Sequence, residues 1–195
     1  ARHLAALGFT GVINRKEDCY RVWAEGRTPA FDVLLTNPPY SGDHVQKLFE
    51  FVSAGCGKGK PWILLIPNYC ATLPSYAGLE RQHSVAYAAP HKRYRYHSPP
   101  GSRSDVAKQE QLKTAPFVTL WFLGSLCSAR AHVLAALRRE DSTAADSSEA
   151  AASLVVADSL SELPASYKAA RSKSDPTSQF CKQFGEFCAR DPGCV

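Results

Sequence analysis

The stretch FDVLLTNPPYSGDH, residues 31–44, decides the fold, because an apolar run of strand-forming residues ends there in a rigid polar corner. Pro38 and Pro39 remove two consecutive backbone donors and fix φ twice, so neither a helix nor a sheet ladder continues through them. The run before them, residues 31–36, is almost unbroken, as in strands that are buried on both faces of a parallel sheet. The sequence therefore predicts a buried strand that ends just before Asn37.

The residues after the corner predict a βαβ unit. Apolar side chains recur there with helical spacing, which predicts a helix over 45–52 that Ser41 or Asp43 caps and Gly55 ends. Residues 61–67 (PWILLIP) are predicted to form the next buried strand. Strand, helix and strand joined by short connections are typical of a parallel sheet, so the fold class is predicted as α/β.

Weaker patterns predict the elements on either side of this unit. Upstream, we expect a helix over 3–8 ended by Gly8, a short strand over 10–15 and a loop over 21–30. Downstream, strand-like pieces within 83–123 are separated by a polar loop rich in Pro, Gly and charge, which predicts a long antiparallel hairpin with a mobile tip.

The C-terminal part of the chain divides into three segments by composition. Residues 124–139 predict a surface helix with cations at its C-terminal end. Residues 140–179 are rich in Ala and Ser with little periodicity, so a flexible linker is expected. Residues 180–195 form a tail rich in Cys and Phe that is a candidate contact for a protein partner.

Charge and cysteine content limit the class of protein. The net charge of +5 and the pI near 8.8 favour a polyanionic partner over an acidic one. The seven cysteines are an odd number, which indicates reduced thiols in an intracellular protein rather than a disulfide framework. The last three lack a nearby His and zinc-knuckle spacing, so no metal site is predicted. No apolar run approaches the ~20 residues that a membrane span needs, and no signal peptide is recognisable.

The corner carries chemistry of its own. The Asn37 side-chain oxygen and the Pro38 carbonyl are acceptors, and neither proline offers a competing N–H. Two acceptors that are held rigidly toward one point suit a planar NH2 group, whose nitrogen lone pair they draw out of conjugation. Tyr40 offers a flat face on which a ring bearing that group can stack, worth ~1–3 kcal/mol per base. The structural alternative is a proline-rich turn that only ends the strand.

The segment FDVLLTNPPY resembles the amino-methyltransferase motif of Rossmann-like, S-adenosylmethionine-dependent enzymes that methylate the exocyclic nitrogen of adenine. The resemblance covers residues 1–123 and implies the C-terminal two-thirds of such a domain. The implied fold is a partial class I methyltransferase sheet with helices on both faces, ending in an antiparallel hairpin. It also implies that Asn37 and the Pro38 carbonyl orient the target nitrogen, that Pro39 completes the motif and that Tyr40 stacks on the base.

The segment NRKEDCY, residues 14–20, resembles the part of the family that lies beside the cofactor adenine. The resemblance assigns Asp18, with Glu17 as second choice, to the adenine of S-adenosylmethionine, and places Cys19 along the ring and Asn37 on the cofactor side of the corner. The alternative is that the two carboxylates are solvated loop residues.

One feature of the family is missing from the sequence. The glycine-rich loop after the first strand and the acidic residue that ends the second strand are absent, and the 30 residues before FDVLLT are too few for another βαβ unit. The chain also contains no methionine. We therefore expect either a fragment or a chain that is incomplete for cofactor binding by itself.

A basic, tyrosine-containing region within 91–115 points to nucleic acid. Cations there outnumber the two carboxylates Asp105 and Glu110, and tyrosines interleave with them, a pattern suited to backbone contacts plus stacking. This region also resembles the terminal hairpin of a little-characterised eukaryotic branch of the family. An ordinary solvated hairpin is the alternative. The candidate nucleic-acid-binding residues are Lys92, Arg93, Tyr94, Arg95, Tyr96, Arg103, Lys108 and Lys113.

Three functions are compatible with these observations. The leading one is methyl transfer to N6 of adenine in DNA or RNA. The second is methylation of a protein glutamine, because a side-chain amide is also a planar NH2 and the same corner serves that family. The third is a catalytically inactive scaffold or RNA-binding module in a larger complex.

Overall fold

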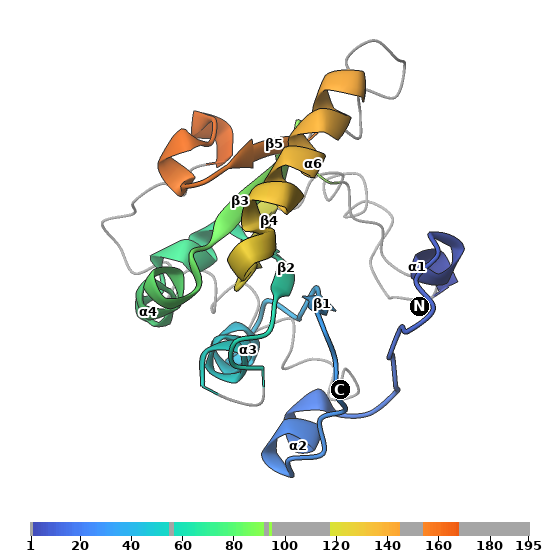
Figure 1. Cartoon of the computed structure of the whole chain (residues 1–195). Coiled ribbons are helices and arrows are strands. Elements are labelled where there is room, and N and C mark those ends of the chain that lie inside the picture. The colour runs from blue at the N-terminus through green and yellow to red at the C-terminus, as the bar shows by residue number, and fades with distance from the viewer. Residues whose placement is uncertain (1, 55–56, 92–93, 95–117, 145–153, 168–195) are drawn as a thin grey trace, which may run out of the picture.

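The computed structural model describes residues 2–54, 57–91, 94, 118–144 and 154–167, with side chains up to Arg138 in the fourth of these ranges. Its centre is a five-stranded open sheet with the strand order β1-β2-β4-β3-β5 (Figure 1). The first pair is parallel and the other three pairs are antiparallel, so the sheet is mixed. The strands are β1 Leu34–Thr36, β2 Trp62–Pro67, β3 Ala86–Pro90, β4 Thr119–Gly124 and β5 Leu154–Ala157.

Helices occupy the connections and both ends of the described chain. The α-helices are α1 Arg2–Ala6, α2 Cys19–Ala24, α3 His44–Ser53, α4 Pro74–His83 and α6 Arg130–Ala144. Short 3-10 helices are η1 Asn68–Thr72, η2 Cys127–Ala129, η3 Leu160–Glu162 and η4 Ala165–Tyr167. The prediction of an α/β fold is therefore confirmed.

The βαβ unit that the sequence predicts is present as β1, α3 and β2. β1 and β2 are parallel, with Leu34 opposite Trp62 and Thr36 opposite Leu64. α3 follows the predicted helical stripe, and all four residues of that stripe are buried: Val45, Leu48, Phe49 and Val52. Asp43 is the N-cap residue of α3, but its carboxylate pairs with Lys47 Nζ at 2.9 Å instead of bonding to the helix backbone.

The predicted hairpin is present as the antiparallel pair β3 and β4, with Tyr87 opposite Phe122. β4 also pairs with β2 along its whole length, so it lies between the parallel pair and β3. The predicted tip of the hairpin lies outside the described residues, apart from Tyr94.

Helices cover both faces of the sheet, as predicted. Alternate residues of the strands pack on one face against α3 and α4, where Leu64, Phe122 and Tyr87 lie in one buried cluster. The residues between them face α6, where Trp121 and Leu123 pack with Val133 and Leu137 of that helix. Figure 1 shows α6 on one side of the sheet and α3 and α4 away from it.

Two predictions about the segment before β1 are wrong. No strand forms over residues 10–15. The first part of the predicted loop over 21–30 is helical, because α2 spans Cys19–Ala24. A helix begins there because the Asp18 carboxylate accepts hydrogen bonds from the N–H groups of Tyr20 and Arg21. This N-cap stabilises the first turn of α2.

The linker expected over 140–179 does not hold for residues 154–167. β5 extends the sheet beside β3, and Leu163 and Tyr167 beyond it are only 1% and 4% exposed. The short apolar run LVVA therefore pairs through its backbone despite its Ala- and Ser-rich surroundings. α6 also continues to Ala144, past the predicted end of the surface helix. The tail 180–195 lies outside the described residues.

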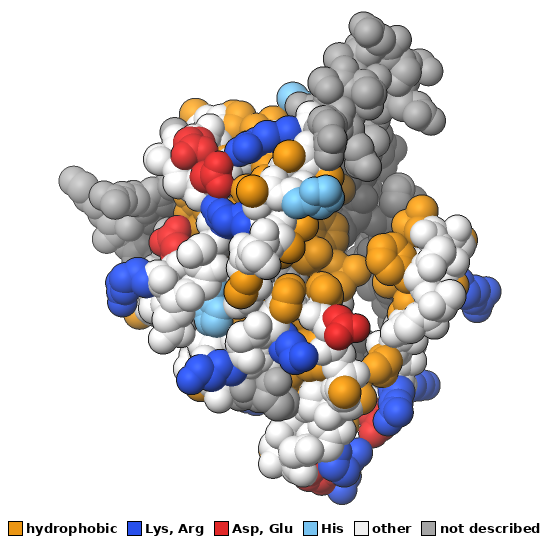
Figure 2. All heavy atoms as spheres, in the orientation of Figure 1, with side chains coloured by type: hydrophobic (Ala, Val, Ile, Leu, Met, Phe, Trp, Pro, Cys, Tyr) orange, Lys and Arg blue, Asp and Glu red, His pale blue; other side chains and the backbone are white. Residues whose placement is uncertain are grey.

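The exposed large hydrophobic residues of the described chain all lie in its first 35 positions. They are Leu7, Phe9, Ile13, Val33 and Leu35, with exposed fractions between 44% and 75%. Figure 2 shows hydrophobic side chains gathered between α6 and the segment that carries α1. A search for a helix of sufficient length and apolarity to cross a membrane finds none in the described part of the chain.

Candidate functional site

The Asn37–Tyr40 corner begins at the carboxyl end of β1, next to the end of β2. Thr36, the last residue of β1, lies opposite Leu64, and the Tyr40 hydroxyl reaches the carbonyl of the next β2 residue, Leu65, at 3.1 Å. The same hydroxyl donates to Asn37 Oδ1. The Tyr40 side chain is half-buried against the core. The corner is thus fixed across the ends of the two parallel strands, where ligands of open α/β sheets bind.

The hydrogen bond from Tyr40 defines what Asn37 can do. Asn37 is exposed, and its Oδ1 has two lone pairs, of which one accepts from Tyr40. The second lone pair can accept a hydrogen from an amine. Pro38 adds a backbone carbonyl and no N–H. The corner therefore holds the Asn37 acceptor next to the Tyr40 side chain.

A second tyrosine, which the sequence analysis did not single out, forms a hydrogen bond to the backbone of the corner. Tyr69 lies in η1, directly after β2, and its hydroxyl donates to the Tyr40 carbonyl at 3.3 Å. The neighbouring Asn68 donates from its backbone to Val118 O at 2.8 Å and from its side chain to Tyr167 O at 3.2 Å. The position of Tyr69 in the sequence could have indicated it, because Tyr69 comes shortly after the second parallel strand, as Tyr40 comes shortly after the first.

The two carboxylates that the sequence assigns to the cofactor both have partners within the protein. Asp18 Oδ1 accepts from Tyr20 N at 2.9 Å and is the N-cap of α2. Glu17 pairs with Arg27 at 3.3 Å and lies 4.0 Å from Arg15. Asp18 therefore caps the start of α2, and Glu17 forms ion pairs beside that helix.

A shallow hollow of about 140 Å³ lies along this segment. Glu17 and Cys19 line it together with Val22, Trp23 and Arg27, whereas Asp18 does not. Burial, and then the charge of Asp18, raise the pKa of the Cys19 thiol. Cys19 is therefore a neutral wall of the hollow rather than a reactive thiolate.

A contact between Tyr20 and His44 ties the α2 segment to the element after the corner. The Tyr20 hydroxyl lies 2.6 Å from His44 Nδ1, and the two rings stack with centroids 5.3 Å apart. His44 is the first residue of α3, and Lys47 of the same helix places Nζ 5.1 Å from the centre of the Tyr20 ring. The structure thus brings the predicted cofactor segment to the start of α3.

The protonation of Tyr20 follows from its surroundings. Burial raises the pKa of Tyr20 to about 12, together with the neighbouring Cys19, which is ionised only at alkaline pH, and the carboxylates of Asp43 and Asp18. The phenol therefore keeps its proton near neutral pH, and its hydroxyl shares a hydrogen bond with His44 Nδ1. The sequence analysis did not single out this pair, since nothing in the spacing of residues 20 and 44 indicates a contact.

Of the residues predicted to bind nucleic acid, the structure describes only Tyr94. Its hydroxyl accepts from Trp121 Nε1 at 2.7 Å, on the face of the sheet that α6 partly covers. The seven others lie outside the described residues: Lys92, Arg93, Arg95, Tyr96, Arg103, Lys108 and Lys113.

The described residues fit S-adenosylmethionine only at one end. The hollow beside Cys19, Val22 and Trp23 offers an apolar wall of the kind that an adenine ring needs. Where the chain following a strand is described, no glycine-rich turn stands there to take the methionine end. The corner thus offers hydrogen-bond acceptors and the hollow a partly apolar surface, and the described residues do not form a complete cofactor cradle.

Neither a scan against protein-family models nor searches of curated proteins and of solved structures give a match to this chain. Its function is accordingly inferred from the geometry of the corner and from the motif that the corner resembles.

Proposed function

We propose that the Asn37–Tyr40 corner is the amine-binding half of an N-methyltransferase site, and that its target is the exocyclic amino group of adenine in DNA or RNA. The observation that carries the proposal is the Tyr40 hydroxyl, which donates to Asn37 Oδ1 and to Leu65 O and so fixes ring and amide together at the strand ends.

In this proposal each residue of the corner has a distinct task. Asn37 Oδ1 and the Pro38 carbonyl accept the two hydrogens of the amino group, which localises the nitrogen lone pair and stabilises the positive charge that develops on nitrogen. The half-buried Tyr40 ring provides the stacking surface. S-adenosylmethionine, when bound, supplies an electrophilic methyl group. Adenine in a duplex is out of reach, so the base must be unpaired or flipped out.

The arrangement of elements supports a partial Rossmann-like methyltransferase sheet as the finer description of the fold. The parallel unit β1-α3-β2 precedes an antiparallel β3-β4 pair, and helices lie on both faces. This is the order of elements that the motif resemblance implies.

Substitution of Asn37 tests the proposal directly. In the full-length protein, Asn37→Ala should lower methyl transfer to an adenine-containing oligonucleotide by about ten-fold to a hundred-fold, because an aligned acceptor is lost. The control is Gln46→Ala, which removes an exposed side-chain amide of α3 that bonds to Glu50 and should keep the wild-type rate. Unchanged transfer by Asn37→Ala would refute the role of Asn37.

The same assay separates the competing functions. Single-stranded oligonucleotides and glutamine-containing peptides of the release-factor type are offered in parallel, with radiolabelled methyl donor. Product on the peptide alone would replace the nucleic-acid assignment with protein glutamine methylation. Product on neither substrate would favour the inactive scaffold.

Calorimetric titration of S-adenosylmethionine into the 195-residue chain addresses the cofactor separately. We expect weak or no binding, since the described residues offer only the hollow beside Cys19. Tight binding would show that the remaining residues complete the cofactor cradle.

A further inference from the structure

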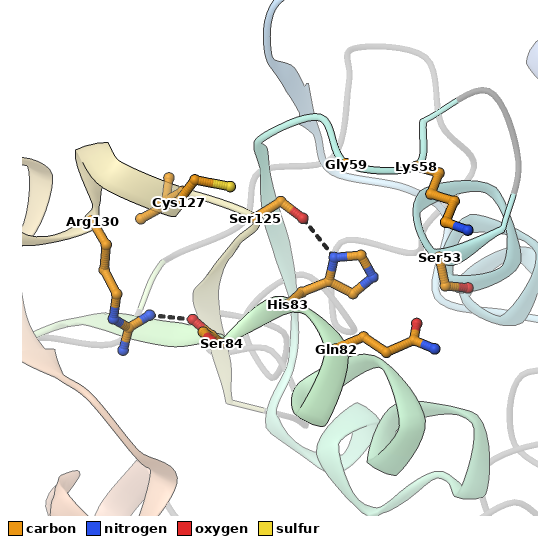
Figure 3. Close-up of a pocket in the computed structure, with 10 residues that line it drawn as sticks. Ser53, Lys58, Gly59, Gln82, His83, Ser84, Ser125, Cys127 and Arg130 are labelled. Carbon is orange, nitrogen blue, oxygen red and sulfur yellow. Dashed lines mark hydrogen bonds between the residues drawn. The ribbon is translucent and has the colours of Figure 1, made fainter.

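A second cavity, of about 530 Å³, lies at the end of the sheet opposite the corner. It is formed where α3 and α4 end, just before β2 and β3 begin and just after β4 ends. Figure 3 shows the polar side chains around it, which come from four separate stretches of the chain. Those that matter here are Lys58, Gln82, His83, Ser84, Ser125 and Arg130.

His83 is the most unusual side chain of this cavity. The residue is only 9% exposed, and its Nδ1 lies 2.5 Å from Ser125 Oγ. Its other ring nitrogen, Nε2, is buried and has no hydrogen-bond partner among the described residues. In Figure 3 the ring turns this nitrogen away from Ser125, toward the side of the cavity where Lys58 and Gln82 lie. A buried polar atom without a partner is rare in native proteins and calls for an explanation.

The protonation state of His83 bears on whether its unpaired Nε2 donates or accepts a hydrogen bond. Burial lowers the pKa of His83, so the ring is neutral near pH 7. The contact with Ser125 allows two tautomers of this ring. In the tautomer that accepts the Ser125 hydroxyl at Nδ1, the single ring proton resides on Nε2, and this N–H requires an acceptor such as a ligand or water oxygen.

Two carbonyls at the end of α4, those of His83 and Ser84, accept hydrogen bonds from within the protein. Ser125 N donates to His83 O at 3.0 Å, and Arg130 donates to Ser84 O through one nitrogen and to Asp158 Oδ1 at 2.8 Å through another. The negative end of α4 is thus covered by Ser125 and Arg130. None of the lining residues in the described chain carries a carboxylate, and Lys58 is an exposed cation on the rim.

The backbone around the cavity is held in an uncommon conformation. Ser84, Ser125 and Cys127 have φ of 47°, 55° and 49°, and they are the non-glycine residues with positive φ in the described chain. All three line this one cavity. Strained backbone of this kind gathers at binding and catalytic sites, where surrounding contacts enforce it.

We propose that this cavity binds a small molecule through an oxyanion, a phosphate or carboxylate group, which accepts hydrogen bonds from His83 Nε2 and Lys58 Nζ. Lys58 and Gln82 are exposed, so their side chains can turn to admit an oxygen to the buried nitrogen. The volume exceeds that of a bare anion and is within the range of small-molecule sites. This site is separate from the corner and does not depend on the methyltransferase proposal.

Nitrogen-15 NMR of the histidine rings in the whole chain tests the site with defined probes. Inorganic phosphate, ribose 5-phosphate and acetate are titrated, and ribose serves as the uncharged control. We expect a saturable shift of the His83 Nε2–H signal with ribose 5-phosphate and none with ribose. A shift with inorganic phosphate of equal affinity would indicate a site for the free ion, and a shift with acetate alone a carboxylate site.

Two substitutions locate the binding. Lys58→Gln should weaken it by about ten-fold through loss of one charge-assisted hydrogen bond. The control Lys60→Gln removes an exposed cation of the same turn that does not line the cavity, and should leave affinity unchanged. His83→Asn keeps a group that can reach Ser125 but has nothing at the Nε2 position, so it should abolish binding while thermal unfolding confirms its fold.

Two results would overturn the proposal. One is the absence of any saturable shift with phosphate, ribose 5-phosphate and acetate at millimolar concentration. The other is equal weakening by Lys58→Gln and Lys60→Gln, which would mean that the anion is attracted only by surface charge. Neither result bears on methyl transfer at the corner.

Discussion

The hydroxyl group of Tyr40 determines both the orientation of the Asn37 amide and the position of the Tyr40 ring. Its hydrogen bond to Asn37 Oδ1 orients the amide, and its contact with Leu65 O fixes the ring against the end of β2. Because one O–H serves both acceptors, the position of the ring and the direction of the Asn37 oxygen are coupled. Removal of the hydroxyl should uncouple them without removing the stacking surface.

Tyr40→Phe tests this coupling. We expect the free energy of unfolding to fall by about 0.5–1.5 kcal/mol, the usual contribution of one hydrogen bond, and kcat for methyl transfer to fall by about ten-fold as Asn37 loses its orientation. Urea unfolding and steady-state kinetics of the full-length protein measure the two effects. Tyr69→Phe, which loses the bond to the Tyr40 carbonyl but keeps the Tyr40 hydroxyl and Asn37 in place, is the comparison and should lower kcat less. An unchanged kcat in Tyr40→Phe would mean that the ring alone fixes the corner.

Tyr20 predicts a pH dependence of stability. Its pKa of about 12 lies above the ordinary value of 10.0, so the folded state holds the phenol proton more tightly than the unfolded chain does. Tyr20 therefore contributes its full stabilisation below pH 10, and this contribution is lost as pH rises from 10 to 12. The difference in free energy of unfolding between the wild type and Tyr20→Phe should shrink over this interval. Urea titrations at several alkaline pH values measure it, and a difference independent of pH would contradict the raised pKa of Tyr20 and the burial that causes it.

At the scale of single elements, α3 and α2 show what the sequence could predict and what it could not. The stripe of Val45, Leu48, Phe49 and Val52 specifies α3, because burial of one helical face dominates its energetics. α2 has six residues, none of them buried, so no stripe was there to find. β5 was missed for the same reason, since four residues paired at the edge of a sheet leave little periodicity.

The candidate site shows the same division. Asn37 to Tyr40 could be named from their order in the sequence, because their rigidity and chemistry are local. Tyr69 and the Tyr20–His44 pair could not, because their contacts join residues that are 29 and 24 positions apart. The structural task of Asp18 depends on where α2 begins, which the sequence interpretation had placed in a loop.

Asp18 can be tested for its two candidate roles by paired substitutions. Asp18→Ala removes the N-cap of α2 and should lower the free energy of unfolding by about 0.5–2 kcal/mol, whereas Asp18→Asn keeps an equally good cap and should have little effect. Urea unfolding measures both. If the carboxylate also contacts the cofactor, Asp18→Asn should weaken S-adenosylmethionine binding to the full-length protein without loss of stability. Equal stability of Asp18→Ala and the wild type would exclude the capping role.

At the scale of the whole molecule, the segment after β5 joins distant parts of the fold. The Tyr167 hydroxyl donates to Pro90 O at the end of β3, and its carbonyl accepts from the side chain of Asn68, next to Tyr69. Leu163 and Tyr167 complete the buried cluster on the α3 and α4 face of the sheet. Residues that composition alone placed in a linker therefore contribute to the core that supports the corner.

Leu163→Ala tests whether this segment is part of the cooperative fold. Leu163 is 1% exposed and lies in the main buried cluster, so its truncation should lower the free energy of unfolding by about 2–5 kcal/mol. Leu7→Ala is the matched control, because Leu7 is 75% exposed and its loss should change stability by no more than about 0.5 kcal/mol. Chemical unfolding of the 195-residue chain gives both values. If residues 154–167 instead dock loosely, Leu163→Ala would unfold at the same denaturant concentration as Leu7→Ala, and the support that Asn68 receives from Tyr167 could not be transmitted to the corner.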